Sequence, residues 1–309
     1  RHTPALIAEY AQRSAGREAG RLWLDVTSVK EAPVQAMLAS QAEVLGLHPM
    51  TAPPKSPTLK GRVLVVCPAR VEAWQGWVQA LCTALEAECV QSTPSQHDQR
   101  MALVQAMVHA THLAQAGVLR SYQPLLGELS ALMPFRSASF ELDAAIIARI
   151  FALNPAIYED IQFGNPHVAP MLQQLVTQLQ ALHAQVAQGD DDARAGFRRQ
   201  WLQDNRAVLG EAGVAEGNYT FERVGYLLAD LTETQAVSVH LPEDRPGSLR
   251  ALLHVFETHG ISLASIHSSR TPAGEVHFRI GFVAGSDSAR IAAAAAEVDT
   301  TGIGRVLAR

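Results

Sequence analysis

The 309-residue chain has 48% hydrophobic and 18% charged residues and a net charge of −5, a composition that excludes a disordered chain. Because it has no basic block interleaved with aromatic residues, we expect no nucleic-acid partner. No apolar run reaches the roughly 18 residues of a membrane span, and the first residues do not resemble a signal peptide, so we expect a cytoplasmic protein of two or three domains without a membrane partner. Its three cysteines, Cys67, Cys82 and Cys89, show no CxxC spacing, which predicts reduced thiols and neither a disulfide framework nor a metal site.

Residues 1–92 alternate short apolar runs with amphipathic segments. The spacing predicts strands over 21–26, 43–47, 61–67 and 88–91, and helices over 31–40 and 71–85. Short buried strands that alternate with helices are typical of an α/β layered sheet. The proline-rich interruption at 51–60 is expected to be a loop.

The pattern becomes purely helical at Thr93. Thr93-Pro94-Ser95-Gln96 is typical of an N-cap followed by a proline at the first helical position. Helices are predicted over 95–120, 137–152, 155–163, 166–189, 190–209 and 219–231, with a glycine-rich break at 210–217. Residues 93–232 are therefore expected to form an all-helical domain.

Residues 233–309 return to a mixed pattern. Strands are predicted over 236–241, 261–268, 275–283 and 304–308, helices over 248–259 and 286–298, and a turn at 271–274. The order β-α-β-β-α-β is that of a ferredoxin-like sandwich.

Three polar features stand out against this background. Asp25 to Lys30 follows a strand and enters a helix, at the sheet edge where α/β proteins bind ligands. His48 ends the next strand, and Arg149 is a cation on a mostly apolar helix. Each also has a plain interpretation: a loop histidine without a role for His48, and an ion pair within the protein for Arg149.

Together these segments resemble a known family. DVTSVKEAPVQAML…VLGLHPM is similar to the second half of the nucleotide domain of prephenate dehydrogenases, the NAD-dependent enzymes of tyrosine biosynthesis. TPSQHDQRMALVQAMVHATHLA resembles the start of their helical dimerisation domain, and ARIFALNPAIYEDIQFGN resembles its substrate-binding arginine segment. The resemblance implies a partial Rossmann-type nucleotide domain, a helical dimerisation domain and a homodimer.

The resemblance also implies roles for five residues. His48 matches the catalytic histidine, which takes a hydrogen bond or a proton from the C4 hydroxyl of prephenate as hydride leaves C4. Ser28 would orient this hydroxyl and the nicotinamide, and Lys30 would pair with a substrate carboxylate. Arg149 would bind the ring carboxylate through its planar guanidinium, and His109 would lie near the nicotinamide or the substrate.

Other matching residues are given structural roles or depart from the family. His97 and Asp98 are expected to hold the start of their helix, and His112 is also expected to be structural. Residues 51–54, Thr-Ala-Pro-Pro, differ from the family pattern after the histidine. No G-x-G-x-x-G occurs before Asp25 or at any strand-to-helix turn, so Arg1 is expected to enter in the middle of the family's Rossmann domain. NAD is therefore implied by the resemblance alone, and NADP stays an alternative.

Two C-terminal segments carry a second resemblance: Asp244-Arg245-Pro246-Gly247-Ser248-Leu249 at a strand-to-helix turn, and Ile266-His267-Ser268-Ser269-Arg270 at a strand end. They are similar to the corresponding segments of an ACT domain, a regulatory module that binds amino acids. A turn with a glycine before a helix leaves backbone N–H groups free for a carboxylate. The resemblance implies that tyrosine or phenylalanine binds as an effector at Pro246, Gly247, Ser248, Leu249, Ile266, His267 and Ser268. The alternative is a domain that only dimerises.

The expected activity is the NAD-dependent oxidative decarboxylation of prephenate to 4-hydroxyphenylpyruvate. Arogenate dehydrogenase, which performs the same ring chemistry on an amino acid, is the first alternative. If the chain starts at residue 1, a second alternative is a non-catalytic dimer that binds aromatic amino acids.

Overall fold

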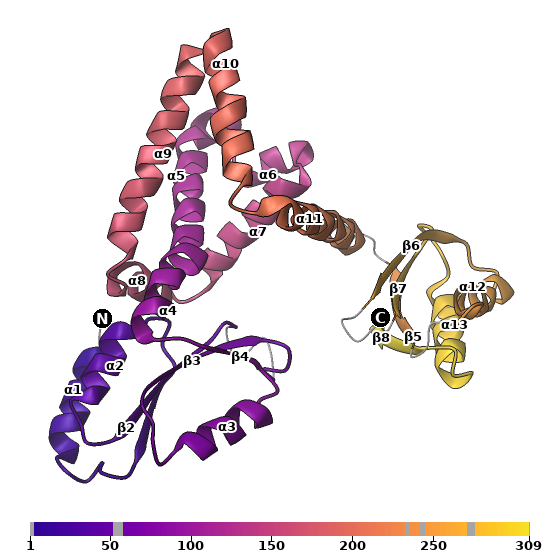
Figure 1. The fold of residues 1–309 in the computed structure, drawn as a ribbon. Helices are drawn as coiled ribbons and strands as arrows, with labels where there is room; N and C mark the ends of the chain where they lie inside the picture. Colours follow the sequence, from indigo (N-terminus) through magenta and orange to yellow (C-terminus); the bar gives the residue numbers. More distant parts are fainter. Residues whose placement is uncertain (1–2, 52–57, 233–234, 242–244, 271–275, 309) are drawn as a thin grey trace. The chain divides into compact units, whose positions relative to one another are not determined.

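The computed structural model describes residues 3–51, 58–232, 235–241, 245–270 and 276–308. The chain divides into two compact units, residues 1–197 and residues 198–309 (Figure 1). The three-domain division at residues 92 and 232 stays a prediction.

A four-stranded mixed sheet forms the base of the first unit. Its order is β1-β2-β3-β4, with β1 parallel to β2, β2 antiparallel to β3, and β3 parallel to β4. The strands are β1 (Leu22–Asp25), β2 (Glu43–Pro49), β3 (Val63–Arg70) and β4 (Glu88–Gln91). All four strands lie where the sequence predicts them, although β2 extends to Pro49 and β3 to Arg70, beyond their predicted ends.

Helices cover both faces of this sheet. α1 (Thr3–Ser14) and α2 (Glu31–Leu38) lie on one face, and α3 (Gln75–Ala84) lies on the other (Figure 1). The sequence does not predict α1, which has no fully buried residue. The loop expected at 51–60 lies mostly outside the described residues.

The alternation of side chains along β2 decides which way His48 points. Leu45 and Leu47 pack in the cluster that contains Val78 of α3, whereas Val44 packs with Val34 of α2. Because successive side chains of a strand point to opposite faces, His48 shares the α2 face with Val44.

Helices make up the rest of this unit. Thr93 caps α4 as predicted, because its side chain accepts a hydrogen bond from the Gln96 N–H. The helix expected over 95–120 contains a π-helical segment, η1, between two α-helices. The elements are α4 (Pro94–Met101), η1 (Ala102–Met107), α5 (Val108–Leu126), α6 (Leu129–Leu132), η2 (Met133–Phe135), α7 (Ala138–Ala152), α8 (Pro155–Gly164), α9 (Val168–Gln188) and α10 (Asp191–Phe197).

The second unit begins with η3 (Arg198–Asp204) and α11 (Gly210–Thr232). The predicted glycine-rich break at 210–217 is wrong, because α11 runs through Gly213 and Gly217. A glycine inside a helix costs only about 1 kcal/mol relative to alanine, and neighbouring helix-forming residues outweigh that cost.

The remainder of the second unit is a ferredoxin-like sandwich, as the sequence predicts. Its antiparallel sheet has the order β6-β7-β5-β8. Leu252 and Phe256 of one helix and Ala294 of the other pack against the sheet in a single core. The elements are β5 (Ala236–Leu241), α12 (Ser248–Thr258), β6 (Leu263–Arg270), β7 (Val276–Phe282), α13 (Ser288–Thr300) and β8 (Arg305–Ala308). The turn expected at 271–274 lies outside the described residues.

Within the described ranges, no helix combines the length and apolar character needed to cross a membrane.

Gly46 provides a test of how tightly the sheet packs beside His48. A Cβ at this position would lie 3.0 Å from Lys30 Cδ and 3.0 Å from Val34 Cγ2. Because both neighbours are buried, we expect Gly46→Ala to lower the free energy of unfolding by about 1–3 kcal/mol. Urea unfolding followed by circular dichroism measures this change.

Gly76→Ala is the matched control, since nothing lies within 4 Å of a Cβ at this helical position of α3. It should be neutral or slightly stabilising. Equal effects of the two substitutions would contradict the close packing around Gly46.

Candidate active site

A cavity of about 600 Å³ lies in the first unit, between the carboxyl ends of two strands and the helices above them. Four of the predicted site residues line it: Ser28, His48, His109 and Arg149. Segments far apart in sequence form its wall. They are the start of α1, the turn after β1, the start of α2, the end of β2, η1, the start of α5, the end of α7, and α8. The structure therefore brings together most of the predicted catalytic and substrate-binding side chains.

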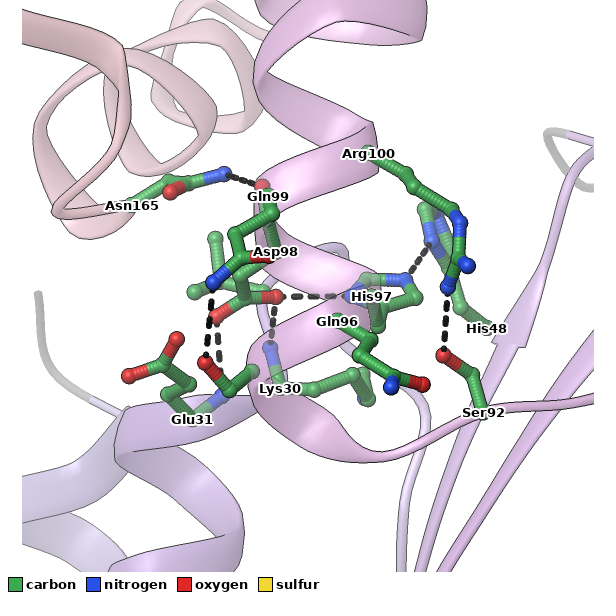
Figure 2. A network of polar contacts seen from close by, with 12 residues as sticks. Lys30, Glu31, His48, Ser92, Gln96, His97, Asp98, Gln99, Arg100 and Asn165 are labelled. Atoms are coloured by element: carbon green, nitrogen blue, oxygen red, sulfur yellow. Dashed lines mark hydrogen bonds and ion pairs between the residues drawn. The ribbon is translucent and has the colours of Figure 1, made fainter. Parts of the chain in front are cut away.

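His48 enters this cavity from the end of β2 and is buried, with 5% of its surface exposed. Its Nδ1 lies 2.9 Å from Nε2 of His97 on α4, and the two rings meet edge to face (Figure 2). Burial, together with the neighbouring His97 ring and the Lys30 ammonium, lowers the pKa of His48 to about 3. A neutral imidazole at the cavity wall is the form that accepts protons.

The contact with His97 continues to Asp98. Nδ1 of His97 lies 2.7 Å from Oδ1 of Asp98, and both side chains are buried. The Asp98 carboxylate also accepts hydrogen bonds from the backbone N–H groups of Lys30, at 2.8 Å, and Glu31, at 2.9 Å. Asn165 closes the cluster by donating from Nδ2 to the Asp98 carbonyl at 2.7 Å.

The sequence interpretation of His97 and Asp98 needs correction. Asp98 does hold the start of a helix, but that helix is α2, 67 and 68 residues away in the chain, and not its own helix α4. His97 contacts His48, the predicted catalytic histidine, and the sequence does not predict this contact. Only the position of both residues near the start of α4, after a strand of the same sheet, hints at this contact.

Lys30 does not reach the cavity. Its side chain is fully buried and forms an ion pair with the buried carboxylate of Asp25. Burial lowers the pKa of Lys30, and Asp25 opposes that shift. Because turning Lys30 toward a ligand would leave Asp25 as an unpaired buried charge, the structure contradicts the prediction that Lys30 pairs with a substrate carboxylate.

Arg149 lies near the end of α7 and is exposed to the cavity. In the part of the chain that the structure describes, no carboxylate forms an ion pair with Arg149, so the alternative of an internal ion pair finds no support there. Tyr158 of α8 lies close to this guanidinium, which partly offsets the rise that burial causes in the Tyr158 pKa. A cation without a protein partner can bind an anionic ligand.

His109 lies at the start of α5 and lines the helical side of the cavity. Its ring meets Tyr158 edge to face with centroids 4.9 Å apart, and its buried Nδ1 has no hydrogen-bond partner among the described residues. Burial and the neighbouring His112 lower the pKa of His109. His112 itself lies outside the cavity and contacts Asp143 of α7 at 3.2 Å, which agrees with the structural role expected for it.

The predicted effector residues lie in the second unit. Gly247 has φ +99° and is the N-cap of α12, and Leu249 and Ile266 are exposed apolar residues. On β6, Ile266 pairs with Ile280, whereas His267 pairs with Arg279 on the opposite face of the sheet. The predicted set therefore does not form one surface, because alternation along β6 separates His267 from Ile266 and Ser268.

The depressed pKa of His48 predicts how stability depends on pH. An unfolded histidine titrates near 6.5, so between about pH 6.5 and 3 the unfolded chain binds a proton at His48 that the folded chain does not. The free energy of unfolding should fall with decreasing pH by about 1 kcal/mol per pH unit more in wild type than in His48→Asn. Urea unfolding at several pH values measures the difference.

His183→Asn, which removes an exposed histidine of α9, is the control and should follow wild type. Parallel curves for wild type and His48→Asn would show that His48 is not held neutral.

Comparisons with known proteins agree with this architecture. Residues 93–201 match the family described as "Prephenate dehydrogenase, dimerization domain", and residues 236–297 match the ACT domain. The T-protein of Enterobacter agglomerans is 33% identical over 193 residues, which are 59% of this chain and 49% of that protein. A probable arogenate/prephenate dehydrogenase of Methanocaldococcus jannaschii is 29% identical over 58% of this chain and 40% of that protein.

Among solved structures, a prephenate dehydrogenase from A. aeolicus in complex with hydroxyphenyl propionate and NAD+ is similar in fold. Its TM-score is 0.51 with 16% identity, over 66% of this chain and 74% of that chain. The chain spans about half the length of the curated relatives it matches. The two matched domains and these relatives identify it as a prephenate dehydrogenase-like protein with a C-terminal ACT domain.

Proposed function

We propose that this chain carries the catalytic histidine and the substrate arginine of an NAD-dependent prephenate dehydrogenase. The observation that carries the proposal is one cavity with a buried neutral imidazole, His48, on its sheet side and a guanidinium free of described partners, Arg149, on its helical side. Such a cavity suits a small molecule that has a hydroxyl to orient and a carboxylate to bind.

In the proposed reaction, prephenate and NAD+ yield 4-hydroxyphenylpyruvate, CO2 and NADH. As hydride leaves C4, the C4 hydroxyl becomes more acidic, and the imidazole of His48 accepts its hydrogen bond more strongly. Loss of CO2 from the ring returns the electron pair of the broken C–C bond to the ring, which becomes aromatic. Arg149 holds the ring carboxylate, and Ser28 at the cavity wall orients the hydroxyl.

A bound nicotinamide would supply the hydride acceptor. The cavity wall at Val26, Thr27 and Ser28 lies at the carboxyl end of β1, where Rossmann-type sheets bind this ring, and His109 lines the same cavity from the start of α5. The chain offers no G-x-G-x-x-G turn for the pyrophosphate. The A. aeolicus prephenate dehydrogenase was solved in complex with NAD+, which favours NAD over NADP as the proposed cofactor.

The substrate choice between prephenate and arogenate depends on the side chain carried by the ring. The M. jannaschii relative is named for both substrates. Among the described residues that line the cavity, Asp160 and Arg149 are the charged ones. We propose prephenate as the substrate and arogenate as the alternative.

A homodimer is the proposed assembly. The match to a dimerization domain supports it, as do apolar side chains that are exposed on the helices of the first unit, namely Leu103, Val104, Val118, Leu125 and Leu179. A second copy would cover such surfaces.

Kinetics on the natural full-length protein test the two assigned roles. His48→Asn should lower kcat by about 10²–10⁴-fold with little change in KM, because its hydrogen bond strengthens only in the transition state. Arg149→Gln should mainly raise KM for prephenate, since the ion pair already exists in the bound ground state. Arg149→Lys, which keeps the charge but not the fork, should fall between wild type and Arg149→Gln. Exchanged phenotypes would contradict the assignment.

We further propose that the ACT domain binds tyrosine, or phenylalanine as the second candidate, at the N-terminus of α12. Nothing lies within 4 Å of a Cβ at Gly247, so a carboxylate can approach the start of α12 closely, although the Ser248 N–H already donates to the Arg245 carbonyl. Leu249 and Ile266 offer apolar surface to a ring. Calorimetry should detect heat with L-tyrosine at millimolar concentration and its loss in Gly247→Ala.

Gly285→Ala is the matched control, because Gly285 also has a positive φ, at +83°, and open space around it. Gly247 follows β5 and Gly285 follows β7. Because these two strands pair antiparallel, the two glycines lie at opposite ends of the sheet. If neither amino acid produces heat, the domain serves dimerisation only.

A further inference from the structure

The proposed function leaves open which ring nitrogen of His48 carries the proton. The contacts that run from Asp98 through His97 to His48 bear on this question. A neutral imidazole has one N–H donor and one bare acceptor nitrogen, and the neighbour of one nitrogen decides the state of the other. Only a bare Nε2 can accept a hydrogen bond in the cavity, because Nδ1 already contacts His97.

The hydrogen bonds can be assigned from the Asp98 end. Two of its three partners are backbone N–H groups, which only donate, so both carboxylate oxygens act as acceptors. The third partner is His97 Nδ1, and the shared proton belongs on this nitrogen because an imidazole is more basic than a carboxylate. Neutral His97 then presents a bare Nε2 to His48.

The contact between the two rings follows from this. Two ring nitrogens 2.9 Å apart need one proton between them. With Nε2 of His97 bare, that proton lies on Nδ1 of His48, and Nε2 of His48 is left as the acceptor. A second proton on His97 would reverse this order and would place the proton of His48 on Nε2 in place of Nδ1.

We infer that His97 and Asp98 are positioning residues that select the Nδ1–H tautomer of His48 and thereby leave its Nε2 free to accept the substrate hydroxyl. This inference rests on the proposed role of His48, but the tautomer itself is a property of the folded chain. Among the described residues, the charged or titratable groups that act electrostatically on His48 are His97 and Asp98 from α4 and Lys30 from the start of α2.

Nitrogen-15 NMR of the histidine-labelled 309-residue chain reads the tautomer directly, without substrate or cofactor. Protonated and bare ring nitrogens have well-separated shifts, and His48→Asn assigns the His48 signals among the 12 histidines. We expect a protonated Nδ1 and a bare Nε2 at neutral pH. A protonated Nε2 in the wild-type chain would overturn the inference, whatever the variants do.

Variants of His97 test the cause. His97→Phe removes the acceptor, so His48 should lose its single Nδ1–H form, whereas the amide oxygen of His97→Gln can accept the same proton and should restore it. His112→Gln, at a histidine that also contacts an aspartate but lies outside the cavity, should leave the His48 signals unchanged. An unchanged tautomer in a folded His97→Phe chain would contradict the inference.

Kinetics on the natural full-length protein separate this inference from the proposed function. We expect His97→Phe to lower kcat by about tenfold or more at unchanged KM, with partial recovery in His97→Gln. An Nδ1–H tautomer together with absent dehydrogenase activity would refute the proposed function and leave the tautomer assignment standing. Full activity in His97→Phe would refute the positioning role alone.

Discussion

The buried carboxylate of Asp98 is the interaction on which the site depends. It is fully buried and accepts hydrogen bonds from two backbone N–H groups at the start of α2 and from the ring of His97. A buried carboxylate without such partners would be very costly, so the three donors hold its position closely. Asp98 thus connects α4 to the start of α2 and, through His97, to the imidazole of His48 at the end of β2.

The hydrogen bonds of Asp98 help to fix the positions of α2 and α4 relative to each other beside the cavity. The first N–H groups of α2 have no partner within their own helix, and Asp98 supplies one from α4. Nearby, His167 contacts Glu31 at 3.0 Å, and Asn165 donates to the Asp98 carbonyl. These two contacts fix the start of α9 beside the start of α2. Because α8 ends directly before Asn165, they also position α8, which forms part of the cavity wall.

The polar groups at this corner divide into two sets with different consequences. Lys30 and Asp25 neutralise each other in the interior and keep the turn after β1 in shape. His48, His109 and Arg149 face the cavity with few or no partners among the described residues. Because groups without protein partners are the ones that a ligand can satisfy, the chemistry is assigned to the second set.

Most elements follow from local sequence. Apolar periodicity predicts the strands of both sheets, the proline and threonine before α4 mark its start, and the ferredoxin-like order is evident from residue 236 onward. The sequence also marks the segment that contains Ser28, and His48 and Arg149, as polar features at strand ends or on an apolar helix, but their candidate roles come from the resemblance to prephenate dehydrogenases.

The partners of these residues are decided only by tertiary structure. Lys30 belongs to a motif that resembles a substrate-binding segment, yet packing buries it against Asp25. His97 and Asp98 resemble a helix start, yet they meet His48 and α2 across more than forty residues of sequence. Periodicity reports which face of a helix or strand is buried, but contacts between buried polar groups depend on how those faces meet, and that depends on the packing of the whole unit.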